Sequence, residues 1–298
     1  MEKADLLLQG AIDMHAHGYP QFTLNMPPRV DNYEWAQAAA NAGMAGFVIK
    51  SHIWPTANEA YLLGRIVNDV KIFGSVTLNY TVGGISPLAV QIAAESGAKV
   101  IFMPTWCSKN DVGKGMHYAD RMRPYVTVID EAMEGKTGLT VFDDNGTLLP
   151  EVTEIIGICK LYGLVLASGH LSIAESLALC KAACNAGVKF VLNHPLSTPL
   201  IAASLDQMKE IADSGGYIEN CFIGCMPMHE RMNPRKIVEV IEYVGAQRCT
   251  MATDAIEAWN PPPPEVLRMY IATMLALGVS DEAVYEMTHT NPAYLLGM

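Results

Sequence analysis

The stretch Ala11-Ile12-Asp13-Met14-His15-Ala16-His17-Gly18 ends an apolar run with two histidines one residue apart. Residues i and i+2 of a β-strand point to the same face of the sheet. His15 and His17 would therefore lie side by side at the carboxyl end of a strand, where two imidazoles can bind one metal ion. The stretch thus predicts a first strand and the first two ligands of a metal site.

Further apolar runs follow the first, and amphipathic helical patterns separate them along the whole chain. Several runs are continuously apolar, which is typical of parallel strands buried on both faces. Glycine follows five of the predicted helices, as expected for helix ends. This alternation predicts an α/β fold, a (β/α)8 TIM barrel. The predicted strands are residues 11–17, 46–52, 71–79, 99–105, 164–170, 189–194, 216–222 and 248–254.

One connection, residues 107–150 after the fourth predicted strand, is too long for a simple loop. Asn145-Gly146 between apolar residues indicates a hairpin within it. An insertion at the carboxyl end of a barrel strand would cover the mouth of the barrel. We therefore expect a single domain over residues 1–298, with this insertion as a lid or substrate wall.

The composition is that of a globular protein with one large core, since 50% of its 298 residues are hydrophobic and 17% are charged. The net charge of -11 argues against nucleic acid as a partner. No apolar run reaches the roughly 18 residues of a membrane span, and no signal-peptide pattern begins the chain. Seven cysteines without a C-x-x-C pair argue against a disulfide framework. We expect a cytoplasmic homo-oligomer that binds neither nucleic acid nor membranes.

Potential metal ligands recur at the ends of later predicted strands. The second ends with Lys50 and His52, and single residues end the fifth, sixth and eighth: His170, His194 and Asp254. Because the carboxyl ends of barrel strands open onto the same mouth, these side chains should converge there with His15 and His17. Histidine together with aspartate suits Zn²⁺, with Mn²⁺, Fe²⁺ or Ni²⁺ as alternatives.

This order of ligands resembles the amidohydrolase superfamily of metal-dependent hydrolases. The stretch Asn291-Pro292-Ala293-Tyr294-Leu295-Leu296-Gly297 is also similar to the closing segment of many members. The resemblance implies that Asp254 binds metal and acts as general base and then general acid. It implies that His194 binds metal or holds the attacking water. The metal ligands it implies are His15, His17, His170, His194 and Asp254.

The fourth predicted strand departs from the superfamily pattern, because neither lysine nor glutamate ends it. The chain therefore favours one metal ion over two. Lys50 could supply a bridging ligand from the second strand, or could contact an anionic substrate. His52 and Trp106 are further candidates for substrate contact, with core packing as the alternative for His52.

The function we expect is hydrolysis by metal-activated water (type EC 3.5), acting on a small amide, cyclic amide, lactone or amine. The first alternative is a decarboxylase of small aromatic acids with a single metal ion. The second is a non-catalytic metal-binding barrel, whose metal site would be closed to water.

Overall fold

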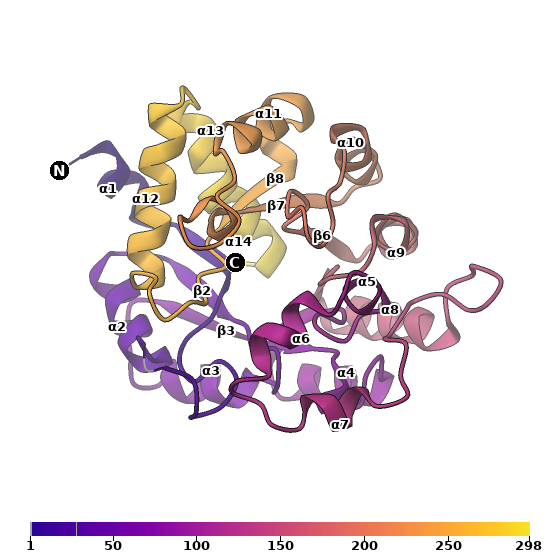
Figure 1. The fold of residues 1–298 in the computed structure, drawn as a ribbon. Coiled ribbons are helices and arrows are strands. Elements are labelled where there is room, and N and C mark those ends of the chain that lie inside the picture. The colour runs from indigo at the N-terminus through magenta and orange to yellow at the C-terminus, as the bar shows by residue number, and fades with distance from the viewer. Residues whose placement is uncertain (1, 28) are drawn as a thin grey trace.

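The computed structural model describes residues 2–27 and 29–298, except for the side chain of residue 117. Its strands pair in parallel in the order β1 to β8, and helices surround them (Figure 1). Backbone hydrogen bonds from Asp254 N to His15 O (2.7 Å) and from His17 N to Ala255 O (3.1 Å) join the last strand to the first. The predicted (β/α)8 barrel is confirmed. The strands are β1 (Ile12–Ala16), β2 (Gly46–Ile49), β3 (Lys71–Thr77), β4 (Ala98–Phe102), β5 (Val165–Ala167), β6 (Lys189–Asn193), β7 (Tyr217–Cys221) and β8 (Cys249–Ala252).

Each predicted strand is present, but most end one to three residues earlier than the apolar runs predicted. The candidate ligands therefore begin where the regular ladder stops. Lys50 directly follows β2, and His194 directly follows β6. Residues that follow the last ladder hydrogen bond of a strand can turn their polar side chains toward the barrel axis. This end of the fold can therefore hold a site.

Half of the helices that cover the barrel begin at side-chain caps. Asp31, Ser86, Ser172 and Ser204 each accept a hydrogen bond from a backbone N–H in the first turn. The helix that begins at Ala57 is short and ends with Gly64 as its C-cap residue. The covering helices are α2 (Asn32–Asn41), α3 (Ala57–Leu63), α4 (Pro87–Glu95), α8 (Pro150–Tyr162), α9 (Ile173–Asn185), α10 (Leu205–Asp213), α11 (Arg235–Val244) and α12 (Pro263–Ala276).

The amino end of the barrel is closed by the C-terminal segment. Leu295 and Leu296 pack with the barrel-interior residues Ile12 and Val48. The Asn291 side chain donates to the carbonyls of Ala246 (2.9 Å) and Cys249 (2.7 Å). The site must therefore lie at the opposite, carboxyl end. The remaining short elements outside the insertion are α1 (Lys3–Leu8), η1 (Tyr80–Val82), η2 (Phe222–Cys225), η3 (Ala246–Arg248), α13 (Asp281–Tyr285), η4 (Glu286–Thr290) and α14 (Asn291–Leu296).

The insertion contains three short helices, α5 (Lys109–Gly113), α6 (His117–Met122) and α7 (Ile129–Met133). The predicted hairpin exists only as one antiparallel bridge between Phe142 and Leu148. The insertion has its own apolar cluster, which includes Trp106 and residues of the loop after β6. Figure 1 shows α5 and α6 close to the barrel and α7 at the lower edge of the view. None of the helices in the described residues is long and apolar enough to cross a membrane.

Candidate metal centre

Three of the predicted ligands meet at the mouth of the barrel. Asp254 Oδ1 lies 3.1 Å from His15 Nε2 and 3.1 Å from His17 Nε2, and all three side chains are buried. Two ligands of one tetrahedral Zn²⁺, each about 2.0 Å from the ion, lie about 3.3 Å apart. The spacing of these three atoms therefore suits one divalent ion.

His170 and His194 complete the cluster from β5 and β6. The ring of His194 lies 5.1 Å from that of His170 and 5.8 Å from that of His15, centroid to centroid. Both ring nitrogens of His194 are buried and have no hydrogen-bond partner among the described residues. Since leaving such atoms unpaired costs about 1–3 kcal/mol each, the pocket suits a ligand that would pair with one of them.

Three of the histidines direct Nδ1 at an oxygen acceptor, which leaves Nε2 for an ion. In metal sites the second ring nitrogen usually donates to a carboxylate or a carbonyl, which fixes the tautomer. The donor set of this chain therefore fits a divalent metal. The pairs are His15 with Glu219 Oε1 (2.7 Å), His17 with the carbonyl of Lys50 (2.9 Å) and His170 with Asp111 Oδ2 (3.3 Å).

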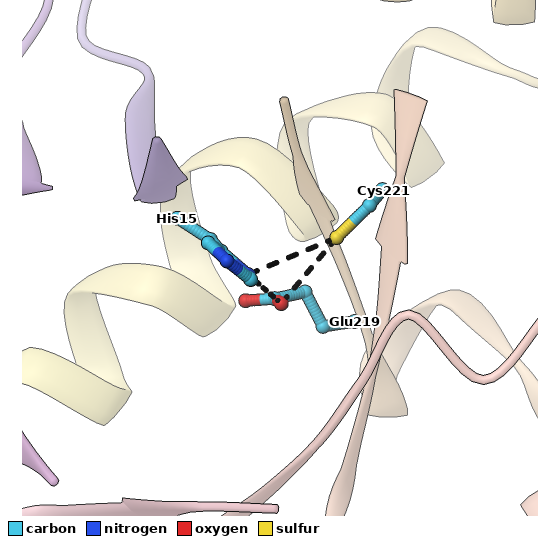
Figure 2. A group of neighbouring side chains, drawn as sticks. All are labelled: His15, Glu219 and Cys221. Atoms are coloured by element: carbon cyan, nitrogen blue, oxygen red, sulfur yellow. Dashed lines mark hydrogen bonds and ion pairs between the residues drawn. The ribbon is translucent and has the colours of Figure 1, made fainter. Parts of the chain in front are cut away.

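Glu219 extends from β7 to His15 (Figure 2). Its carboxylate also accepts a hydrogen bond from β6. Asn193 Nδ2 donates to the same carboxylate oxygen at 2.8 Å, and the Cys221 thiol lies 3.5 Å from it. His15, Glu219 and Cys221 could also be considered as ligands of a separate ion. The 2.7 Å between His15 Nδ1 and Glu219 Oε1 is instead the length of a strong hydrogen bond. We therefore assign Glu219 to the orientation of His15.

The charges of the cluster follow from burial and from neighbouring groups. Burial raises the pKa of the Asp254 carboxyl, but the charge of His15 and hydrogen bonds from both His15 and His17 outweigh burial and hold that pKa well below its usual value. Burial keeps the pKa of His194 well below its usual value. Asp254 is thus a carboxylate and His194 a neutral imidazole, the forms that bind metal.

Two of the candidate ligands have strained backbones. His194 has a φ of 30° and Asp254 a φ of 51°, in the left-handed region that residues other than glycine seldom adopt. Such strain tends to persist at functional sites, where the surrounding structure holds it. Here it turns each side chain out of its strand direction toward the shared centre.

Lys50 and His52 lie next to the cluster, as predicted. Lys50 is fully buried, and its Nζ lies 2.8 Å from His15 Nε2. Burial lowers the pKa of this amine. The ring of His52 stacks on that of His17 at 5.0 Å, and its Nδ1 lies 2.9 Å from Thr105 Oγ1. His52 is therefore packed into the wall of the site.

Trp106 does not take the predicted position against a substrate. It is fully buried in the apolar cluster of the insertion, and its indole N–H donates to the carbonyl of His52 at 3.2 Å. Trp106 does not line the cavity beside His194 and Asp254. The structure gives this residue a packing role instead.

Sequence reasoning missed two residues of the insertion. Asp111 holds His170, and the ring of Tyr118 lies 4.4 Å from the ring of His170. A usable signal for Asp111 was the spacing Ser108-x-x-Asp111, which starts a capped helix directly after the fourth strand. Tyr118 had no such signal. With His194 and Asp254 it lines a cavity of about 20 Å³, which has room for about one water molecule.

The family of the chain is shown by sequence comparison. Residues 10–219 match the model of a family described as a family of unknown function, DUF6282. The chain belongs to DUF6282. A search of curated proteins gave no match.

Solved structures share the fold of this DUF6282 member at low sequence identity. An amidohydrolase from Pseudomonas aeruginosa is 14% identical with a TM-score of 0.66, covering 99% of this chain and 98% of that one. A probable 2-pyrone-4,6-dicarboxylic acid hydrolase from Acinetobacter baumannii is 11% identical with a TM-score of 0.58, covering 97% and 100%. A mutant lactonase from Deinococcus radiodurans is 16% identical with a TM-score of 0.55, covering 100% and 98%. The fold is thus that of amidohydrolase-type barrels, as the sequence resemblance predicted.

Proposed function

We propose that this DUF6282 member is a metal-dependent hydrolase of small molecules. The observation that carries the proposal is the meeting of His15, His17 and Asp254 at ligand spacing, beside His170 and His194. When bound, a divalent ion, zinc above all, would act as a Lewis acid and lower the pKa of its bound water to about 7. The small cavity beside His194 and Asp254 has room for about one water molecule, and an open position for water favours catalysis over a closed structural site.

In this proposal, two residues perform the proton and charge chemistry. The Asp254 carboxylate takes a proton from the attacking water and returns it to the leaving group. His194, whose ring nitrogens have no partner among the described residues, binds the substrate oxygen on which negative charge develops. The substrate is an amide, cyclic amide, lactone or amine. The neighbours named as a lactonase and a pyrone dicarboxylate hydrolase make a cyclic ester as good a candidate as a cyclic amide.

We further propose that the insertion, residues 107–150, acts as a lid. Its α6 brings Tyr118 against His170, and its α5 brings Asp111 to the same histidine. Arg121 of α6 also forms an ion pair with Glu257 in the loop after β8. These contacts cover the carboxyl end of the barrel and would exclude bulk water during the reaction.

Removal of the metal gives the most direct test of the proposed function. Treatment with a chelator should abolish hydrolysis of a panel of lactones and cyclic amides, and Zn²⁺ should restore it. Zinc at 100 times its Kd should also stabilise the fold by about 2.7 kcal/mol, because the unfolded chain lacks the site. Hydrolysis rates and thermal unfolding with and without zinc check both outcomes. Unchanged turnover after verified metal removal would contradict the proposal.

We propose one metal ion per chain, because no lysine or glutamate follows β4 to bridge two ions. Lys50 Nζ could become such a bridge only as a carbamate, formed from the amine and CO2 with loss of a proton. Plasma mass spectrometry of zinc-saturated wild type and Lys50→Met should therefore give one ion per chain in both. A fall from two ions to one would instead identify Lys50 as a bridging ligand.

A decarboxylase is the second candidate, and the absence of a ligand-type residue at the end of β4 supports it. Related single-ion sites can remove CO2 from aromatic acids. Assays for released CO2 on a panel of benzoates, run beside the hydrolysis panel, separate the two reactions.

A further inference from the structure

A second cavity adjoins the metal centre on its β1 and β8 side. It has a volume of about 370 Å³, and its wall combines the loop after β1, helix α6 and the loop after β8. Ligand pockets commonly have volumes of about 300–1,000 Å³. The aromatic residues of the wall are Phe22, Tyr118, Tyr125 and Trp259.

Tyr118 connects this cavity with the reacting groups. It lines both this cavity and the smaller one beside His194 and Asp254. On the same side, the ring of Phe22 lies 6.0 Å from that of His52. Tyr118 is thus the wall that the two cavities share, and a substrate held at Asp254 would reach the second cavity by passing this ring.

The wall is suited to an uncharged, flat group. Phe22 and Tyr125 are stacked at 6.4 Å, and Trp259 stands at the rim with 37% of its surface exposed. The two charged residues of the wall, Arg121 and Glu257, form an ion pair with each other. Because these two charged side chains pair with each other, the aromatic rings form the main surface for recognition in this cavity. Aromatic faces bind other rings by offset or edge-to-face contact.

We propose that the substrate carries an uncharged aromatic or comparable apolar group, and that this group binds in the second cavity against Tyr118, Tyr125 and Trp259. This inference rests on the proposed function, because it places the reactive bond at the metal centre. It narrows the substrate class from small amides and lactones in general to those with an apolar substituent about one ring in size.

Matched substrate pairs test the selectivity. Hydantoin with 5-phenylhydantoin, and δ-valerolactone with its 5-phenyl derivative, differ only in the ring. We expect the wild type to prefer the phenyl compound at least about tenfold in kcat/KM, mainly through KM. Trp259→Ala and Tyr125→Leu should each remove most of that preference. Tyr61→Ala, which removes an exposed aromatic residue from α3, should keep it.

A binding measurement separates this inference from the proposed function. The ¹⁹F line of 4-fluorotoluene should broaden with wild type and Tyr61→Ala, and much less with Trp259→Ala or Tyr125→Leu. Broadening without turnover of any substrate would overturn the proposed hydrolase but support the cavity as an apolar site. Equal broadening in all four proteins, or equal turnover within each substrate pair, would overturn the inference.

Discussion

Asp254→Asn is expected to lower kcat by at least about a thousandfold, while zinc content and fold change little. The amide keeps an oxygen that can bind metal, but it cannot take a proton from water or return one to the leaving group. Steady-state hydrolysis of the substrate found in the panel, with zinc content measured on the same sample, checks the expectation.

The matched control for this variant is Asp144→Asn, which changes an exposed aspartate in the turn of the insertion. It should retain full activity. Turnover within a few fold of wild type in Asp254→Asn would remove Asp254 from the proposed proton transfer, even if the metal centre itself is correct.

Glu219→Leu is expected to weaken zinc binding about 10- to 100-fold, as found when such supporting partners of metal ligands are lost. Leucine cannot accept the hydrogen bond from His15 Nδ1, so the tautomer with a free Nε2 is no longer favoured. The buried N–H would also lose its partner, which costs about 1–3 kcal/mol of stability. Competition with a zinc-binding dye and thermal unfolding measure the two effects.

Glu219→Gln distinguishes orientation from simple packing. Its amide oxygen can still accept from both His15 and Asn193, so zinc affinity should lie between that of wild type and that of the leucine variant. Glu154→Gln, an exposed position on α8, serves as control. Zinc affinity in Glu219→Leu equal to that of wild type would show that Glu219 only fills space.

The sequence predicted the barrel and the meeting of the principal candidate ligands for one physical reason. In a parallel barrel, any residue at the carboxyl end of a strand faces the same mouth, so ligand convergence follows from strand order alone. His15, His17 and Asp254 could be placed together in this way without knowledge of distances. The same rule predicted that Lys50 would lie nearby, but not that its Nζ would lie within 2.8 Å of His15 Nε2.

The insertion could not be predicted in the same way, because its residues follow no regular apolar period. Its hydrophobic residues suggested strands, whereas most of them pack as three short helices around Trp106. The position of Asp111 against His170 depends on that tertiary packing. For the same reason, a buried tryptophan near the mouth could be mistaken for a substrate contact.

The contacts of α5 with His170 divide the insertion into two segments, one anchored at the barrel and one beyond residue 113. Ser108 and Asn110 donate to the carbonyl of His170 at 3.1 and 3.0 Å, and Asp111 contacts the ring of the same residue. A movement of this segment away from the barrel would break these contacts with His170 and disturb the candidate metal centre. If the insertion acts as the proposed lid, its hinge has to lie beyond residue 113, so that α6 and α7 move while α5 keeps its contacts with His170.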